Sequence, residues 1–371
     1  MFENFKVPAN LMPSDPRFGV GPSLVPVEHI ENLLATGQKL LGTSHRKPAV
    51  KNVCKEIQEG LTKYFNLPSG YEVVLGNGGA TFLFDMIGLG LVEKSSVHFT
   101  TGEFSNKWYK SHNKIPWLNA KEVGVEFGQG INPEVTPGYD MVCCTLNETS
   151  TGVMITGVPD VDEDTLLAVD ATSGAGQIPL DMSRVDVYFF SPQKVFASEG
   201  GFFVCIMSPK ALKRAEKLYD REEYFPEIMS WKLAIENSRK NQTYNTPSIS
   251  TLFMLNEQIK RMNALGECEV VEQARAKAKH VYDWANSKDY LSCYVEQDQF
   301  RSIAVATINI DDKYPAEDLS KVLRAQNAAL DIDAYRKLGK NQFRISLFHN
   351  VTLENLKKLT EIISLAIESE K

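Results

Sequence analysis

Short apolar segments alternate with polar or helix-forming stretches through the middle of this sequence, and this alternation limits the folds open to it. The segments lie at residues 96–100, 141–146, 166–170, 185–190 and 201–207. Runs of this length and composition are typical of buried strands. Because helix-forming or polar stretches separate them, the pattern predicts an α/β fold with a mostly parallel sheet wrapped by helices.

Three regions are expected along the chain, which at 371 residues is too long for one small core. Residues 1–16 hold three prolines and no periodic pattern, which predicts an extended N-terminal arm. Residues 17–259 contain the alternating segments and should form a large domain. Residues 260–371 are expected to form a smaller α+β domain, because long amphipathic helices there surround one β pattern. The other predicted elements are helices at 27–41, 48–65, 82–91, 249–264, 267–287, 316–327 and 353–368 and strands at 71–75 and 302–308.

Composition and charge narrow the class of protein. The hydrophobic content of 43% and the charged content of 23% are ordinary for a soluble globular enzyme. The net charge of -7 leaves no basic excess to neutralise phosphates, which argues against a nucleic-acid or anionic-membrane partner. The six cysteines show no CxxC or zinc-like spacing, so no metal site is expected and a reducing compartment fits. Without a secretion signal or an apolar run of 18 residues, the sequence predicts a soluble cytoplasmic protein.

One lysine stands directly behind a predicted strand, in Ser191-Pro-Gln-Lys194. Three interpretations compete: a serine nucleophile with a lysine base, a lysine that holds a carbonyl cofactor as a Schiff base, and a surface lysine at a strand end. The serine–lysine interpretation needs S-D-N and K-T-G partners, and the sequence has neither. The other two interpretations remain open on this stretch alone.

A carboxylate ends the strand before this one. Asp170 closes the apolar run 166–170, so its side chain should lie at the carboxyl edge of the sheet, where α/β proteins bind ligands. A strand-end acid paired with a lysine is what pyridoxal phosphate requires, because the acid keeps the pyridine nitrogen protonated while the amine holds the aldehyde carbon. The competing interpretation is that Asp170 caps the helical segment after it.

A glycine-rich loop, Gly76-Asn-Gly-Gly-Ala-Thr81, runs from a predicted strand into a predicted helix. Backbone N–H groups at such a helix start bind phosphate. A dinucleotide fingerprint is disfavoured because Thr81 stands where a third glycine belongs and no acid ends a second strand about 20 residues on. Phe104, after the 96–100 strand, is placed either to stack on a planar ring or simply to pack.

Six short motifs follow one another along the chain: Gly78-Gly-Ala-Thr81, Gly102-Glu-Phe104, Asn147-Glu-Thr149, Asp170-Ala-Thr-Ser173, Ser191-Pro-Gln-Lys194 and Tyr244-Asn-Thr-Pro247. In this order they resemble the motifs of the phosphoserine aminotransferases, most closely those of the actinobacterial branch. These are pyridoxal-phosphate enzymes of the aspartate-aminotransferase fold (fold type I). The resemblance runs from Gly21-Pro22 to Phe343-Arg344, nearly the whole chain.

The resemblance implies a role for each matched position. Lys194 would hold the pyridoxal phosphate and shuttle protons, Asp170 would hold the pyridine nitrogen, and Thr149 would contact the ring oxygen. Phe104 would stack on the ring. The cofactor phosphate would be bound by Gly79, Ala80 and Gln193, with Thr81 close by, and by Asn245 and Thr246 of the partner subunit.

The same resemblance implies an anionic substrate site. His45, Arg46 and Arg336 match segments that grip the distal phosphate or carboxylate, and Arg344 matches the fork for the α-carboxylate. Arginine forks suit both anions. The alternative interpretation for any one of these arginines is an ion pair at the surface with no role in binding.

Three positions depart from the family pattern. Ala80 replaces an arginine of many members, Phe104 replaces a tryptophan, and Tyr335 replaces a histidine, which shifts phosphate recognition toward His45 and Arg46. The resemblance implies a homodimer with shared active sites. It implies transfer of an amino group between L-glutamate and 3-phosphohydroxypyruvate in serine biosynthesis. A related aminotransferase of the alanine–glyoxylate or serine–pyruvate type is the alternative, followed by a cysteine desulfurase that uses Cys293.

Overall fold

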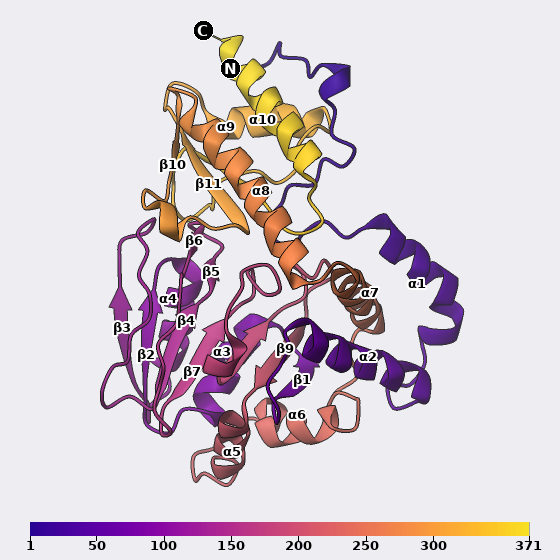
Figure 1. Ribbon diagram of the computed structural model, residues 1–371, viewed down its shortest axis with the longest axis vertical. Helices are drawn as coiled ribbons and strands as arrows, with labels where there is room; N and C mark the ends of the chain where they lie inside the picture. Colours follow the sequence, from indigo (N-terminus) through magenta and orange to yellow (C-terminus); the bar gives the residue numbers. More distant parts are fainter. Residues whose placement is uncertain (371) are drawn as a thin grey trace.

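The computed structural model describes residues 1–370, except for the side chains of residues 37 and 38. A large α/β part and a smaller α+β part lie one above the other along the longest axis (Figure 1). The predicted α/β class, with a mostly parallel sheet, is confirmed.

The large part is built on a sheet of seven strands in the order β1-β9-β8-β7-β4-β2-β3. The five neighbouring strands from β8 to β3 in this order pair in parallel, whereas β9 runs antiparallel to both of its neighbours, β1 and β8. Strands β7 and β8 therefore end at the same edge. The strands are β1 (Glu72–Asn77), β2 (Ser95–Thr100), β3 (Asn119–Gly124), β4 (Met141–Thr145), β7 (Leu166–Asp170), β8 (Val187–Phe190) and β9 (Phe202–Met207).

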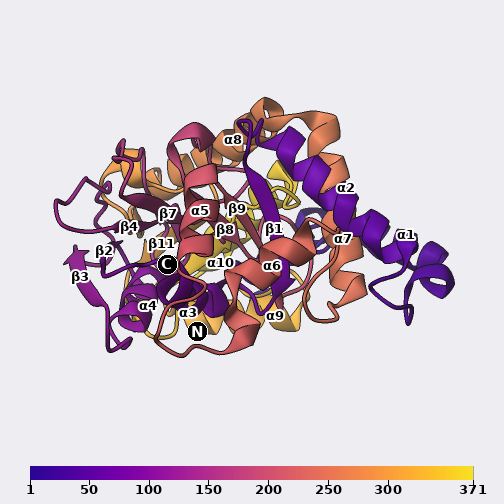
Figure 2. The same ribbon diagram turned by 90° about the horizontal axis from the view of Figure 1, so that it is seen from below.

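Helices cover both faces of this sheet because alternate strand residues point to opposite sides. Along β1, Val73 and Leu75 pack into one core cluster and Val74 into another. Helices α2 (Pro48–Tyr64) and α7 (Ile249–Leu265) cover the first face. The second face is covered by α3 (Ala80–Gly90), α4 (Glu103–His112), α5 (Pro209–Lys217) and α6 (Trp231–Ser238). Figure 2 shows α1 (Val27–Leu40) projecting from the side of the large part.

The smaller part holds a three-stranded antiparallel sheet with helices packed on it. Phe2, Leu11 and Phe18 of the N-terminal segment pack into the same core, and both chain ends lie at this end of the molecule (Figure 1). Its elements are α8 (Glu267–Asn286), β10 (Leu291–Cys293), β11 (Val305–Ile310), α9 (Ala316–Ala325), β12 (Gln342–Ser346) and α10 (Leu353–Glu368).

Short elements complete the chain. A hairpin of β5 (Asn147–Glu148) and β6 (Val153–Met154) follows β4. The single-turn helices are η1 (Ala9–Leu11), η2 (Met182–Arg184), η3 (Glu227–Met229) and η4 (Asp298–Phe300).

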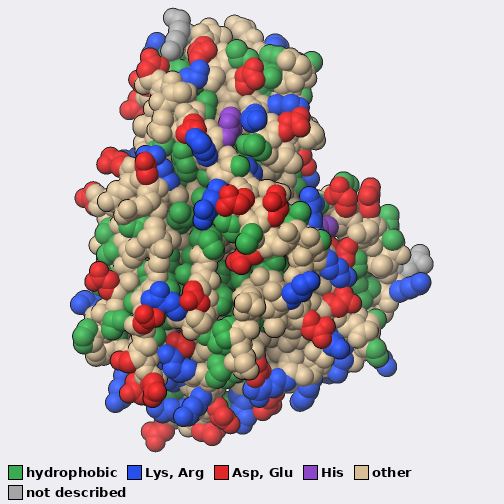
Figure 3. Space-filling model, viewed as in Figure 1, with side chains coloured by type: hydrophobic (Ala, Val, Ile, Leu, Met, Phe, Trp, Pro, Cys, Tyr) green, Lys and Arg blue, Asp and Glu red, His purple; other side chains and the backbone are tan. Residues whose placement is uncertain are grey.

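The helices and strands that the sequence predicts match those of the structure within a few residues. The elements that it did not predict include the helices α4, α5 and α6 and the strand β3. β3 gave no signal because this edge strand is largely exposed and its Asn-Ala-Lys-Glu-Val-Gly segment has no apolar run. Basic and acidic side chains are interspersed on the face in Figure 3, which shows no extended patch of one sign. Among residues 1–370, no helix combines the length and apolar character that a membrane span requires.

Candidate active site

Lys194 lies just beyond the end of β8, half-buried between the sheet edge and the N-terminal segment. Its Nζ donates a hydrogen bond of 2.7 Å to the carbonyl oxygen of Val20. The neighbouring backbone is fixed as well, because Ser23 N donates to Gln193 O at 2.8 Å. A side chain at Gly21 would not fit, since its Cβ would lie 1.7 Å from Lys194 Nζ. The segment 20–23 therefore determines where the lysine amine sits.

Asp170 ends β7 and lies in the same buried region as Lys194. Its Oδ1 accepts hydrogen bonds from Thr172 N at 3.0 Å and Thr172 Oγ1 at 2.5 Å. Its Oδ2 has no hydrogen-bond partner in the described part of the chain. The carboxylate thus caps the turn after it, as one interpretation of the sequence proposed, and still presents one oxygen to the cavity.

Burial favours the neutral form of both groups, so it raises the pKa of Asp170 and lowers the pKa of Lys194. Burial raises the pKa of Asp170 to about 6, although the hydrogen bonds from Thr172 oppose this. Burial, and next the positive charge of Arg344, lower the pKa of Lys194 to about 8. Strongly perturbed pKa values in a cavity are typical of catalytic groups.

A cavity of about 190 Å³ joins these residues at the carboxyl edge of the sheet. Three side-chain oxygens around it are buried without a hydrogen-bond partner among residues 1–370: Thr145 Oγ1, Asn147 Oδ1 and Gln193 Oε1. Buried polar atoms are rarely left unpaired in a native protein, so these oxygens point to a bound polar group. Of the predicted site, the cavity lining brings together Gly79, Ala80, Thr81, Phe104, Thr149, Asp170, Gln193 and Lys194.

The N-terminus of α3 forms one end of this cavity. Ala80 N donates to Ser191 Oγ at 2.6 Å. This N–H group, which was predicted to bind the cofactor phosphate, therefore already has an acceptor. The N–H groups of Gly79 and Thr81 have no hydrogen-bond acceptor in the described residues and remain available to an anion. Lys107 Nζ adds positive charge nearby, where it donates to Thr81 Oγ1 at 3.1 Å.

Arg344, on β12, comes from the smaller part and lies at the mouth of this cavity, where it lines the adjoining hollow. Its Nη1 donates to the carbonyl oxygen of Thr149 at 3.2 Å, and its buried Nε has no acceptor among residues 1–370. The guanidinium lies 5.2 Å from the centre of the Tyr335 ring. Tyr335 in turn packs on Phe104 with 5.8 Å between ring centres. These contacts join the two parts of the chain across the site.

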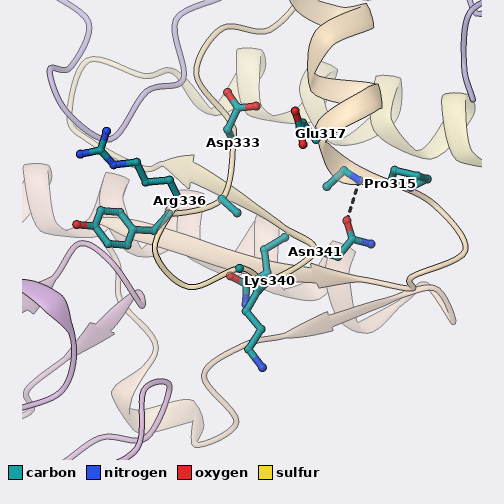
Figure 4. Close-up of a pocket in the computed structure, with 11 residues that line it drawn as sticks. Pro315, Glu317, Asp333, Arg336, Lys340 and Asn341 are labelled. Atoms are coloured by element: carbon teal, nitrogen blue, oxygen red, sulfur yellow. Dashed lines mark hydrogen bonds between the residues drawn. The ribbon is translucent and has the colours of Figure 1, made fainter.

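A second hollow, of about 480 Å³, opens at the mouth of the site between α4 and the 334–337 loop. Lys337 and Glu103 form an ion pair across it. Arg336 lines the same hollow, and its guanidinium has no hydrogen-bond or ion-pair partner in the described chain. Arg336 also lines the neighbouring hollow in the smaller part, together with Glu317 and Lys340, and Figure 4 shows its guanidinium pointing away from both of them.

Four predicted site residues lie away from this cavity. His45 and Arg46 follow α1, and neither lines the cavity or its mouth. Asn245 and Thr246 do not line it either, although Asn77 Nδ2 donates to Thr246 O at 2.9 Å. One chain therefore does not assemble these four residues with Lys194.

Sequence reasoning missed several residues of the site. Ser173 Oγ lies 2.7 Å from Thr149 Oγ1 and 2.8 Å from Asn147 Nδ2, so it orders that wall. The Val20 carbonyl oxygen, which accepts from Lys194 Nζ, is a backbone group, so the residue type at position 20 does not indicate its role. Ser173 and Asn147 were visible only as members of matched motifs.

A half-buried lysine and a buried carboxylate lie at the carboxyl edge of an α/β sheet, in one cavity with a helix N-terminus that still has free N–H groups. This is the arrangement of an enzyme that holds an anionic carbonyl cofactor. The chain belongs to the class-V aminotransferase family: the family model "Aminotransferase class-V" matches residues 22–359. The phosphoserine aminotransferase of Corynebacterium glutamicum (strain R) is 44% identical, and the match covers 98% of this chain and 97% of that protein. The predicted resemblance, actinobacterial relatives included, is confirmed.

Solved structures agree with the fold. A phosphoserine aminotransferase from Cytophaga hutchinsonii has a TM-score of 0.86 and 26% sequence identity, and the match covers 95% of this chain and 99% of that chain. A phosphoserine aminotransferase from Trichomonas vaginalis, with bound pyridoxal phosphate, has a TM-score of 0.83 at 20% identity, with coverage of 94% and 99%. At 20% identity, the similarity to the Trichomonas vaginalis structure shows a shared fold.

Pyridoxal phosphate is the cofactor that the family implies, and the residues present fit it. The free N–H groups of Gly79 and Thr81 suit its phosphate. The free oxygen of Asp170 suits a ring N–H, and the unpaired oxygens of Asn147 and Gln193 offer further polar contacts. Lys194 is the one lysine in the cavity lining.

Proposed function

We propose that this chain is a phosphoserine aminotransferase that moves the amino group between L-glutamate and 3-phosphohydroxypyruvate. The products are 2-oxoglutarate and O-phospho-L-serine, and the pathway is serine biosynthesis. The observation that carries the proposal is the half-buried Lys194 beside the buried Asp170, with Arg344 close to them from the smaller part. The Corynebacterium glutamicum relative is named a phosphoserine aminotransferase, which supports phosphoserine as the amino acid.

The proposed cofactor is pyridoxal 5'-phosphate, which supplies a carbonyl for amines and a ring that withdraws electrons from the substrate's α-carbon. Asp170 holds a proton at the ring nitrogen. Lys194 has a pKa of about 8, so its neutral amine is accessible near neutral pH. A neutral Nζ takes a proton from the substrate and returns it, as general base and then acid.

Substrate binding is assigned to the cationic side chains around the mouth. Arg344 takes the α-carboxylate, which both substrates share, with its free Nε as donor. Arg336 takes the distal anion from the same subunit. His45 and Arg46 take it from the partner subunit, since they lie away from the cavity of their own chain. The protein is then a cytoplasmic homodimer with shared sites.

The alternative activities make different demands on the site. A cysteine desulfurase needs a mobile catalytic thiol, whereas Cys293 is packed in the core of the smaller part. Burial raises the pKa of the Cys293 thiol, which disfavours the reactive thiolate. An alanine–glyoxylate aminotransferase needs no cation for a distal phosphate, whereas Arg336 stands unpaired at this mouth.

An absorbance titration of the purified holoprotein tests the proposal. Phosphoserine and glutamate should convert the absorbance band of the aldehyde form of the cofactor into that of its amine form. Alanine and unphosphorylated serine should do so far more weakly. Borohydride reduction followed by peptide mapping should place the cofactor label on Lys194, and Lys194→Ala should carry none. Conversion by alanine with phosphoserine inert would replace this function by the alanine–glyoxylate type.

A further inference from the structure

Glu148 is a carboxylate buried completely within the large part. Oε1 accepts from Phe104 N at 3.3 Å and from Ser150 N and Oγ at 3.2 and 2.7 Å. Oε2 accepts from Ser105 N and lies 2.9 Å from Ser105 Oγ. No cationic side chain lies within ion-pair distance of it among residues 1–370. Its negative charge is compensated by neutral donors, two of them at a helix N-terminus.

This carboxylate caps α4 from outside the helix. The N-cap residue of α4 is Gly102, which has no side chain to bind the first N–H groups of the helix. A Cβ on Gly102 would lie 2.4 Å from Glu148 Cγ and 2.6 Å from Ser150 Oγ. Glycine is therefore needed so that Glu148 can reach the first turn.

The capped turn carries an aromatic wall of the active site. Phe104 is the second residue of α4, and its side chain lines the cavity that contains Lys194 and Asp170. The residue after Glu148 is Thr149, which lines the same cavity and whose carbonyl oxygen accepts a hydrogen bond from Arg344 Nη1. Glu148 thus joins two walls of the cavity without lining it.

The opposite end of α4 is anchored independently. His112 Nδ1 lies 3.0 Å from Ser96 Oγ and 3.1 Å from His98 Nε2, and Trp108 Nε1 donates to His112 Nε2 at 3.0 Å. All four residues are buried, so they hold the last turn against β2. A change at Glu148 should therefore loosen the first turn of α4, while these contacts keep the last turn of the helix against β2.

We propose that Glu148 is a positioning residue for the cofactor site: its carboxylate fixes the first turn of α4 and thereby holds the Phe104 ring in place. The inference rests on the proposed function, in which Phe104 stacks on the cofactor ring. Glu148 touches neither cofactor nor substrate. Its effect on the reaction passes through Phe104.

The test is a double-mutant cycle on cofactor affinity. Apoenzyme from the full-length chain is titrated with pyridoxamine 5'-phosphate, which binds without a bond to Lys194, and quenching of protein fluorescence gives the Kd. Glu148→Gln keeps the size but faces an NH₂ group toward at least two donors. It should raise the Kd about two- to tenfold, the range covered by loss of one aromatic stacking contact. Phe104→Leu should raise it similarly.

The double variant separates positioning from general stability. If Glu148 acts through Phe104, Glu148→Gln should change the Kd by less than about twofold in the Phe104→Leu background. Thr352→Ala is the matched control, because Thr352 caps α10 in the smaller part with a 3.2 Å bond from Asn355 N. It should lower the Tm and leave the Kd unchanged.

Additive effects in the double variant would overturn the proposal, and so would a lower Tm with an unchanged Kd in Glu148→Gln. Ser150→Ala, which removes one donor to Glu148, keeps the test open if Glu148→Gln does not fold. It should show a smaller rise in Kd that Phe104→Leu also abolishes. Wild-type apoenzyme that fails to bind the probe would instead count against the proposed function.

Discussion

Gly21 and Lys194 are in such close contact that a methyl group at Gly21 would lie 1.7 Å from Lys194 Nζ. The glycine belongs to the N-terminal segment, and the lysine follows β8. The absence of one side chain therefore leaves room for the amine that the proposed reaction uses. The Val20 carbonyl, next to this glycine, accepts the hydrogen bond from the same Nζ.

The first prediction concerns Gly21→Ala. The added methyl should push Lys194 Nζ out of place, so covalent attachment of the cofactor and transaminase activity should fall at least tenfold. Borohydride labelling of Lys194 and activity assays measure this. Gly138→Ala is the control: Gly138 also has a positive φ, of 86°, but an added Cβ would meet no atom within 4 Å. That variant should lose stability without losing the label, and equal losses in both would refute the steric argument.

The second prediction concerns the pH dependence of apoenzyme stability in Asp170→Asn. The pKa of Asp170 is raised from 3.8 to about 6, so the folded state holds this proton more tightly than the unfolded state. Its contribution to stability is full below about pH 4 and is lost as pH rises through about 6. Asparagine does not ionise. The variant should therefore gain free energy of unfolding relative to wild type between pH 4 and 7, on the order of 3 kcal/mol.

Denaturant unfolding of the two apoproteins at several pH values measures this difference. Lys194, with a pKa of about 8, stays mostly charged across this window and does not obscure the result. Asp312→Asn changes an exposed carboxyl and should show no such pH-dependent gain. A wild-type-to-Asp170→Asn difference that stays flat with pH would contradict the raised pKa.

The third prediction separates cofactor binding from turnover, also in Asp170→Asn. The Asp170 carboxylate would keep the ring nitrogen of the cofactor protonated, and that positive charge matters most when negative charge develops on the substrate in the transition state. Turnover should therefore fall by a larger factor than cofactor affinity. Single-turnover rates and equilibrium dialysis provide the two numbers. Weaker binding with unchanged turnover would leave Asp170 only as the cap of the turn at Thr172.

The sequence predicted the parts of the site that a local pattern determines. Asp170 and Lys194 each follow an apolar run, and a run that ends at a polar residue shows where a strand reaches the edge of the sheet. The start of α3 was visible for a similar reason, because glycines interrupt the pattern between a strand and a helix.

The remaining contacts depend on tertiary packing that a local pattern does not encode. Arg344 Nη1 meets the Thr149 carbonyl across 195 residues of sequence. Glu148 reads locally as an ordinary acidic residue in a short strand, and its role appears only when α4 docks onto it. The Val20 carbonyl is a backbone group with no signature at all. Only the family resemblance, through Phe343-Arg344, indicated Arg344 beforehand.

The fourth prediction concerns Arg344→Ala. Glutamate and phosphoserine share an α-carboxylate, so both should lose affinity, by about 2–5 kcal/mol for one hydrogen-bonded charge partner. Arg46→Ala and His45→Ala should instead change the ratio between the two substrates, because these residues are assigned to the distal group. Arg344→Lys keeps the charge but not the fork and should recover only part of the loss. Unchanged Michaelis constants for both substrates in Arg344→Ala would refute the carboxylate role.

The fifth prediction is that Arg46 acts on the partner subunit's site. Arg46 lies away from the cavity of its own chain, whereas Arg336 lines the mouth of its own. Lys194→Ala and Arg46→Ala proteins, each nearly inactive, are unfolded together, refolded and assayed. Half of the dimers formed at random are hybrids. In a twofold dimer with exchanged residues each hybrid has one intact site, so about a quarter of wild-type activity should return.

The control mixture is Lys194→Ala with Arg336→Ala. Because Arg336 and Lys194 belong to the same site of the same chain, every site in such a hybrid lacks one residue and no activity should return. Mass spectrometry with one isotope-labelled variant confirms that hybrids form in both mixtures. Proven hybrids without recovery in the Arg46 mixture would place Arg46 outside the shared site. Recovery in the Arg336 mixture would mean that Arg336, too, reaches across the interface.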